Sequence, residues 1–237
     1  MLDELRAVLP LLGADAPREE AHRLIVDEDL LHHDSITART WVYKKLGMRF
    51  YPRTAPRAAG AFIRAAQSES DPSQLALLAY EMIAWQDGLV FMLGKEWLLQ
   101  RLRLPGYAAE TRDILDELEW LENNRADCVK AWNGATRQSV AAHYLGLLRD
   151  CGLATGSLRK ELRSPYVAPD TVLFGTRLIL GGGEGAAAVP EHELFAIMGL
   201  SPTDVVDALT ELHAEGRLVF RVQGSVVHIE LEEGDAG

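Results

Sequence analysis

Seven basic side chains and no acidic one occur in residues 35–64 of this chain. We call this set the basic island: Arg39, Lys44, Lys45, Arg49, Arg53, Arg57 and Arg64. The stretch is unexpected in a 237-residue chain with a formal net charge of −11. Guanidinium and ammonium groups bind phosphate oxygens, so the pattern favours contact with a polyanion such as a nucleic acid. The alternative is an internal surface that forms ion pairs with the acidic N-terminus or with residues 106–127.

The first part of the basic island is predicted to be a helix that Ser35 caps and that runs to about Phe50. With side chains about 100° apart around the helix, one face is predicted to be apolar and the other to face solvent. The apolar face carries Ala38, Trp41, Val42 and Leu46, and the solvent face carries Arg39, Thr40, Tyr43, Lys44 and Gly47. Because Lys45 and Arg49 project toward the apolar side, either this register is shifted or their stems lie along apolar surface.

A second candidate for nucleic-acid contact spans residues 133–156. Thr136 is expected to cap a helix that ends at Cys151-Gly152, with Arg137, Gln138 and Ser139 in its first turns. Small and polar residues at the start of a helix allow close approach to a groove, and helix N-termini favour phosphate. Three further bases follow the helix: Arg159, Lys160 and Arg163. A purely structural role for this helix remains the alternative.

The elements that position these residues are predicted to be mainly helices. We expect helices at about 2–12, 35–50, 55–67, 72–85, 87–103 and 108–131, besides a second helix that begins at Pro17 and the one capped by Thr136. The fold class is therefore mainly α: a multi-helix globular protein with helix-turn-helix or winged-helix-like elements and a small C-terminal β-hairpin. Residues 1–164 are expected to form the helical domain.

Residues 165–190 are predicted to be a linker, because Pro165, Pro169 and a glycine-rich run punctuate them. A short strand is expected within it, from Val172 to Leu180. Residues 191–237 then follow the order helix, turn, helix capped by Ser201, and hairpin, which predicts a small winged-helix-like domain. Its second helix exposes Asp204, Asp207 and Glu211, and because these acids repel phosphates, DNA contact is not expected there.

Catalytic and metal-binding patterns find little support in the sequence. The histidines show no ligand spacing such as HExxH, and no GxSxG or Walker motif occurs. Residues 27–34 (DEDLLHHD) gather acids and histidines, but a solvated acidic turn is the preferred interpretation. We therefore expect no enzyme activity, no cofactor, no metal site and no small-molecule substrate.

Localisation is predicted to be cytoplasmic. The N-terminus carries acids before a short apolar run, unlike a signal peptide. The most apolar stretch, residues 75–104, is interrupted by charges, so it is expected to form buried core helices and not a membrane span. The two cysteines, Cys128 and Cys151, form no CxxC pair and are expected to be buried free thiols.

Two segments carry a family resemblance. DEDLLHHDSITARTWVYKKLGMRFYP and WNGATRQSVAAHYLGLLRDCGLATG resemble the best-marked segments of the BrxA family, which are accessory proteins of BREX bacteriophage-exclusion systems. Ser164-Pro165-Tyr166-Val167 and the terminal hairpin also fit. The resemblance implies a mainly helical cytoplasmic protein that binds double-stranded DNA and supports phage restriction or host DNA modification by partner proteins. Members have been labelled inner-membrane proteins, which the charges within residues 75–104 argue against here.

The leading hypothesis is a non-enzymatic, sequence-tolerant binder of double-stranded DNA that works with other phage-defence proteins. A protein-interaction scaffold, with the basic island docking an acidic partner, is the first alternative. RNA binding in an antitermination-like role is the second.

Overall fold

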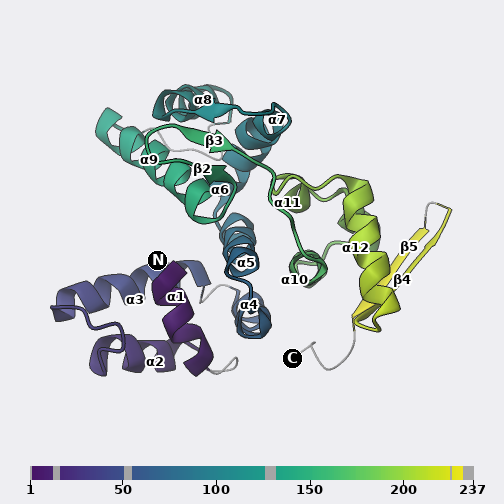
Figure 1. Cartoon of the computed structure of the whole chain (residues 1–237), viewed down its shortest axis with the longest axis horizontal. Helices are drawn as coiled ribbons and strands as arrows, with labels where there is room; N and C mark the ends of the chain where they lie inside the picture. The colour runs from purple at the N-terminus through teal and green to yellow at the C-terminus, as the bar shows by residue number, and fades with distance from the viewer. Residues whose placement is uncertain (1, 13–16, 51–54, 126–131, 225, 232–237) are drawn as a thin grey trace.

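The computed structural model describes residues 2–12, 17–50, 55–125, 132–224 and 226–231 (Figure 1). Arg53 and Cys128 lie outside these residues. The chain is mainly helical, as predicted, and a single cluster of buried apolar side chains extends from Leu5 to Phe220.

The N-terminal helices pack around the helix that carries the first bases of the basic island. They are α1 (Leu2–Val8), η1 (Leu9–Leu11), α2 (Pro17–His22) and the π-helical turn η2 (Arg23–Asp27). The predicted helix at 35–50 is α3 (Ile36–Phe50), and Ser35 Oγ accepts a hydrogen bond from the Ala38 amide at 3.2 Å. Val42, Leu46 and Phe50, four residues apart, are buried and fix α3 to the core.

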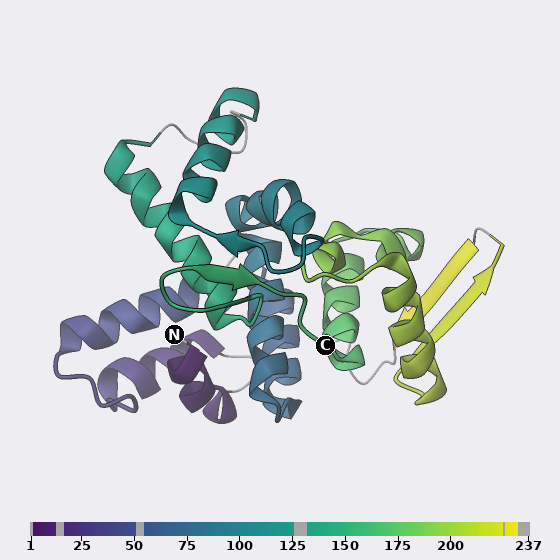
Figure 2. The ribbon, with the colours of Figure 1, turned by 45° about the horizontal axis from the view of Figure 1, so that its top comes forward.

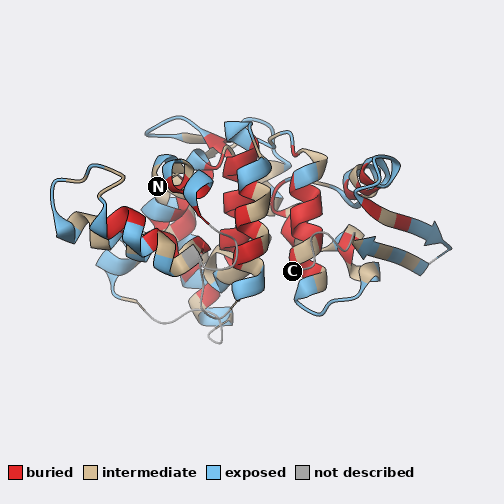
Figure 3. Ribbon diagram, turned by 90° about the horizontal axis from the view of Figure 1, so that it is seen from below, coloured by how far each residue is buried: buried red, intermediate tan, exposed pale blue. Residues whose placement is uncertain are grey.

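The centre of the molecule is α5 (Pro72–Gln86), whose residues are buried continuously from 74 to 84 (Figure 3). A helix that is apolar on all sides belongs in a core. It packs against α4 (Pro56–Ser68), where Phe62 stacks on Phe50 of α3 with ring centroids 5.0 Å apart. The prediction of buried core helices in residues 75–104 is thereby confirmed for α5.

The predicted helix at 87–103 is divided into α6 (Gly88–Leu93), η3 (Gly94–Leu98) and α7 (Leu99–Leu102). Asp87 separates α5 from α6, and its carboxylate accepts hydrogen bonds from the Leu89 and Val90 amides at 3.1 and 3.3 Å. The chain turns by 107° there. No single helix in the described ranges is long and apolar enough to cross a membrane; only α5 and residues 88–102 together, as a bent pair, reach that length and composition.

A helix pair and a small sheet form the next part of the chain. The helices are α8 (Thr111–Asn124) and α9 (Gly134–Asp150), which pack on each other. Strands β1 (Ala108–Ala109), β2 (Ala154–Thr155) and β3 (Lys160–Leu162) form an antiparallel sheet in the order β1-β3-β2. The sheet was not predicted, because strands of two or three residues show no periodicity.

The linker and strand predicted within residues 165–190 are wrong. This segment contains α10 (Pro169–Gly181), a helix of 13 residues whose residues 171–176 are all buried. Because α10 is apolar on most sides, the sequence lacks the 3.6-residue period that marks a surface helix, and its β-branched residues favoured a strand. The glycine-rich run begins only where α10 ends, and Gly183 there has a φ of +93°.

The C-terminal elements follow the predicted order. They are η4 (Ala186–Glu191), α11 (Glu193–Ala196), α12 (Pro202–Ala214) and the hairpin β4 (Leu218–Gln223) and β5 (Val226–Leu231). Ser201 and Asp204 form the predicted capping box of α12, and the Ser201 hydrogen bonds lower the pKa of the Asp204 carboxyl. The hairpin projects from the body of the protein (Figures 1 and 2).

Helices α5 and α10 approach closely at Gly175. A Cβ atom at this position would lie 2.6 Å from Cε1 of Phe195 and even nearer to the Glu81 carboxylate. Gly175→Ala is therefore expected to lower the free energy of unfolding by about 2 kcal/mol, because the helices must move apart. Chemical denaturation measures this change.

The matched control for this substitution is Gly181→Ala at the end of α10, where a Cβ would meet nothing within 4 Å. This variant is expected to be neutral or slightly stabilising, because alanine is the better helix former. Equal destabilisation by the two substitutions would contradict close packing at Gly175.

Candidate nucleic-acid interface

The predicted solvent face of α3 is partly occupied by contacts within the protein. The Arg39 guanidinium forms an ion pair with Asp29 at 2.8 Å, and its Nε donates to the His33 carbonyl at 3.3 Å. The Tyr43 ring lies edge-on to His22, and its hydroxyl donates to the Arg18 carbonyl at 3.4 Å. Thr40 Oγ1 donates to the carbonyl of Ile36 in its own helix. Of this predicted face, Lys44 remains well exposed.

The rotation predicted for α3 is right for Val42 and Leu46, which are buried, and wrong for Trp41 and Gly47. Trp41, placed on the apolar face, is 61% exposed, and Lys45 beside it is exposed as well. Gly47, placed on the solvent face, is buried, and a Cβ atom at this position would lie 3.7 Å from Nη2 of Arg18. The N-terminal helices cover the side that the sequence assigned to solvent, so the exposed side of α3 carries Trp41, Lys44, Lys45 and Met48.

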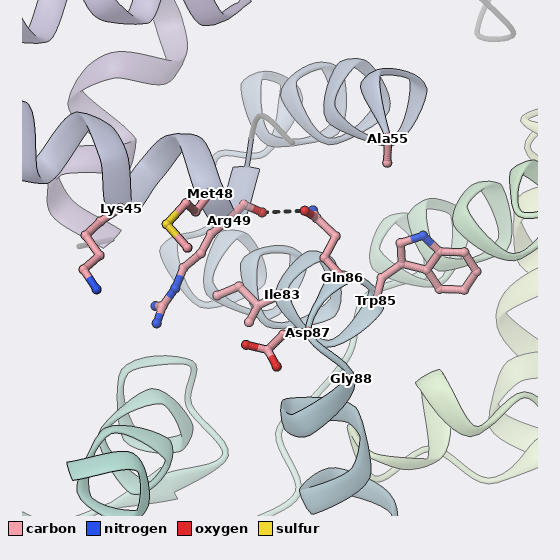
Figure 4. A pocket seen from close by; sticks show the side chains of 9 residues that line it. All are labelled: Lys45, Met48, Arg49, Ala55, Ile83, Trp85, Gln86, Asp87 and Gly88. Carbon is pink, nitrogen blue, oxygen red and sulfur yellow. Dashed lines mark hydrogen bonds between the residues drawn. The ribbon is translucent and has the colours of Figure 1, made fainter. Parts of the chain in front are cut away.

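The remaining bases of the basic island lie in several environments. Arg49, half-buried at the end of α3, accepts at its backbone carbonyl a hydrogen bond from Gln86 Nε2 at 3.0 Å (Figure 4). Arg57 is exposed in the first turn of α4, and Arg64 is half-buried two turns later.

The second candidate segment forms α9, but the predicted cap is wrong. Asn133 caps the helix, because its Oδ1 accepts from the Thr136 amide at 2.8 Å, so Thr136 lies inside the first turn. Thr136, Gln138 and Ser139 are exposed. Arg137 instead forms an ion pair with Glu122 of α8. The alternative of internal ion pairs therefore describes Arg39 of the basic island, and the alternative of a structural role describes Arg137.

The bases after α9 lie on or beside the β2–β3 hairpin. Arg159 is exposed, with its Nε 3.4 Å from the Glu110 carboxylate. Lys160 Nζ donates to the Ser157 carbonyl at 2.6 Å, and Arg163 Nε donates to the Gly152 carbonyl at 2.9 Å. The last contact ties β3 to the glycine that ends α9.

The two candidate segments meet at one groove. A cavity of about 480 Å³ is lined by Trp41, Lys45 and Arg49 of α3 and by residues of α9. The α9 residues include Ala142, His143, Gly146 and Arg149. An adjoining cavity of about 600 Å³ also contacts Lys45, Arg49 and Ile83, and it continues to Asp87 (Figure 4). Lys45 and Arg49 extend to the same side of α3 (Figure 4).

Three cations and two carboxylates line the 480 Å³ cavity, which we call the α3–α9 groove. The cations are Lys45, Arg49 and Arg149, and the carboxylates are Glu4 and Asp150. Asp150 Oδ1 accepts hydrogen bonds from Nε and Nη2 of Arg149 at 3.0 and 2.7 Å. The sequence offered little signal for Arg149 or His143, because only the packing of α9 beside α3 brings them to the basic island.

Cys151 also lines this groove. Its thiol is free and buried, as predicted. Burial raises its pKa, and the neighbouring Asp150 adds to this effect, so the thiol stays protonated and unreactive. Within the described ranges, no group of three or more His, Cys, Asp or Glu side chains is placed to hold a metal ion. The acidic turn at 27–34 contributes Asp29, whose carboxylate accepts from the His33 amide at 3.0 Å as well as pairing with Arg39.

Comparison with known proteins settles the family. The sequence profile of the BrxA family matches residues 1–174, which include α3, α9 and the groove between them. The chain belongs to the BrxA family. It is therefore a component of a BREX phage-defence system, and the resemblance noted from the sequence is confirmed. No curated protein and no solved structure matches this BrxA-family chain significantly.

Proposed function

We propose that this BrxA-family protein binds double-stranded DNA through the α3–α9 groove and the exposed bases beside it, and that it catalyses no reaction. The observation that carries the proposal is the meeting of two basic segments, about 100 residues apart in sequence, at one cavity. In a chain with a formal net charge of −11, cations gathered at one place overcome the general repulsion of phosphates.

The cations whose side chains reach the surface are the proposed phosphate contacts, and two of them, Arg149 and Arg159, also form surface ion pairs with Asp150 and Glu110. Lys44 and Lys45 are exposed on α3, and Arg149 has a side chain that is 47% exposed on α9. Arg57, Arg159, Lys160 and Arg163 would extend the contact on either side. Arg39 and Arg137 would act differently, because their ion pairs with Asp29 and Glu122 hold α3 and α9 in place.

The order of elements around α9 supports duplex DNA as the ligand. A helix pair followed directly by a short hairpin is typical of winged-helix proteins, in which the second helix enters the major groove. Here α8, α9 and the β2–β3 hairpin have this order. The first turns of α9 present Thr136, Gln138 and Ser139, side chains able to donate to phosphate or base edges.

In this proposal the protein acts in the bacterial cytoplasm with other proteins of the BREX system. Its contribution would be to hold DNA, while partner proteins carry out restriction or modification. The acidic α12 and the projecting hairpin are then surfaces for protein contact and not for DNA.

The test is a titration of a fluorescent 20-base-pair duplex of arbitrary sequence with the full chain at low salt, followed by competition. The labelled duplex is expected to bind. Unlabelled duplex DNA is expected to displace it, and double-stranded RNA of equal length is expected to displace it more weakly. Preferential displacement by RNA would favour the antitermination-like role. Absence of binding to either at low salt would leave the protein-interaction scaffold as the better account.

A further inference from the structure

Trp41 is an unusual residue to find on the outside of a helix. Its side chain is 61% exposed on α3, whereas Trp97 is fully buried in the core. The Lys45 ammonium lies 5.5 Å from the centroid of the Trp41 ring and is the one cation placed over it among the described residues. An exposed tryptophan beside a cavity is typical of a surface that stacks on a flat partner.

The groove next to Trp41 has the size and lining for a flat group. Its volume of about 480 Å³ lies within the range of roughly 300–1,000 Å³ that small-molecule sites occupy. Val42 and Leu46 form apolar wall on the α3 side. On the α9 side, Ala142 and Gly146 are small, and a Cβ atom at Gly146 would meet nothing within 4 Å. An aromatic ring system could therefore approach the α9 backbone closely.

The charges in the groove favour a base over a phosphate as the group that occupies it. Glu4 and Asp150 line it together with the cations, and carboxylates repel phosphate. Carboxylates do accept hydrogen bonds from the exocyclic amino groups of cytosine and adenine. The phosphates attached to such a base would lie at the rim, near the exposed ammonium groups of Lys44 and Lys45.

We propose that the α3–α9 groove accommodates a nucleobase displaced from duplex DNA, with Trp41 stacking on it. The inference rests on the proposed function and deepens it: the flanking duplex contacts the exposed cations, and the unpaired base enters the groove. Proteins that bind displaced bases hold them between aromatic or apolar side chains and read their hydrogen-bonding edges, which is the combination found here. Thymine is the disfavoured base, because it alone lacks an exocyclic amino group that a carboxylate could accept from.

The test compares three labelled DNAs with the full chain: a matched 20-base-pair duplex, the same duplex with one central bulged adenine, and the corresponding single strand. The bulged duplex is expected to bind about 10-fold more tightly than the matched one, as expected for stacking of one base on an aromatic ring. It is also expected to bind more tightly than the single strand.

Variants assign the preference to Trp41. Trp41→Ala is expected to reduce the affinity ratio of bulged to matched duplex from about 10 to about 1, and Trp41→Phe to restore part of it. Trp120→Ala is the matched control, because Trp120 is 46% exposed on α8 and lines neither cavity. This variant is expected to keep the full ratio.

Three results would overturn the inference. They are equal binding of bulged and matched duplex, single-strand binding as tight as that of the bulged duplex, and a preference that survives Trp41→Ala. Each of these leaves binding of the matched duplex intact, so the proposed function stands. Failure of all three DNAs to bind at low salt would instead overturn the proposed function together with the inference.

Discussion

Reversing one charge on each side of the α3–α9 groove, in the double variant Lys45→Glu/Arg149→Glu, is expected to weaken binding of duplex DNA by about 100-fold at low salt. Each substitution removes a cation that faces the groove and adds an anion beside the phosphates. Both side chains are exposed, so the fold is expected to tolerate the change, and thermal unfolding of the variant checks this. Fluorescence anisotropy with a labelled duplex measures the loss.

The control changes the net charge by the same amount elsewhere. Arg112→Glu/Arg221→Glu places the two reversals on α8 and on β4, where neither residue lines the groove. This variant is expected to weaken binding only a few-fold, through the general repulsion of a more acidic protein. Equal losses in the two double variants would show that binding depends on net charge and not on the groove.

The single variants add information about the two helices. If Lys45 and Arg149 contact the same duplex, each reversal is expected to cost about 10-fold, and the two costs to combine in the double variant. If only Lys45→Glu weakened binding, α9 would lie outside the DNA interface, and α3 would be the helix that contacts the duplex.

The second large effect is a dependence of stability on pH that arises from Glu81. Its carboxyl is fully buried in α5, and neither oxygen has a hydrogen-bond partner among the described residues. Burial raises the pKa of this group well above its ordinary value of 4.5, because the charged form would lose its hydration. Glu81 is therefore protonated in the folded protein at pH values where the unfolded chain has already released its proton.

The sign of the effect follows from this difference. The folded protein holds the proton more tightly, so stability is fully present below about pH 4.5 and falls as the pH rises toward the folded-state pKa. The loss is about 1.4 kcal/mol for each pH unit in that interval. Glutamine has no proton to release, so Glu81→Gln lacks this pH-dependent loss. The variant is therefore expected to gain stability relative to the wild type as the pH rises. Chemical denaturation at several pH values from about 5 to about 8 measures the difference.

The control for this prediction is Glu119→Gln on α8, where the side chain is exposed. This variant is expected to follow the wild-type pH dependence closely. If Glu81→Gln and the wild type showed parallel stability curves over the whole range, the Glu81 carboxyl would have to be ionised or solvated in the folded state, against its position in the core.

Much of the fold could be predicted because its signals are local. Ser35 and Ser201 begin helices as expected, since an N-cap depends only on residues within one turn. The family could also be recognised from two short segments. Helix α10 was missed because a helix buried on most sides shows no amphipathic period, and its content of β-branched residues favours a strand.

The site was predicted only in part, because the role of a surface side chain depends on what packs beside its helix. The basic island and the second segment were identified, yet the sequence could not show that α2 and η2 cover the face of Tyr43 and Gly47. Nor could it show that Asp29 and Glu122 engage Arg39 and Arg137. Trp41 was placed on the apolar face of its helix, since an exposed tryptophan has the same helical spacing as a buried one.

The central claim is that this BrxA-family protein binds duplex DNA through phosphate contacts with the exposed cations at the rim of the α3–α9 groove, and the salt dependence of binding tests it most directly. A plot of the logarithm of the binding constant against that of the salt concentration has a slope of about −0.9 for each phosphate neutralised. Contacts from Lys44, Lys45 and Arg149, extended by Arg57, Arg159, Lys160 and Arg163, predict a slope of about −6, and Lys45→Glu/Arg149→Glu is predicted to flatten it by about 2. Binding that is insensitive to salt, or a slope that the double variant leaves unchanged, would contradict the account.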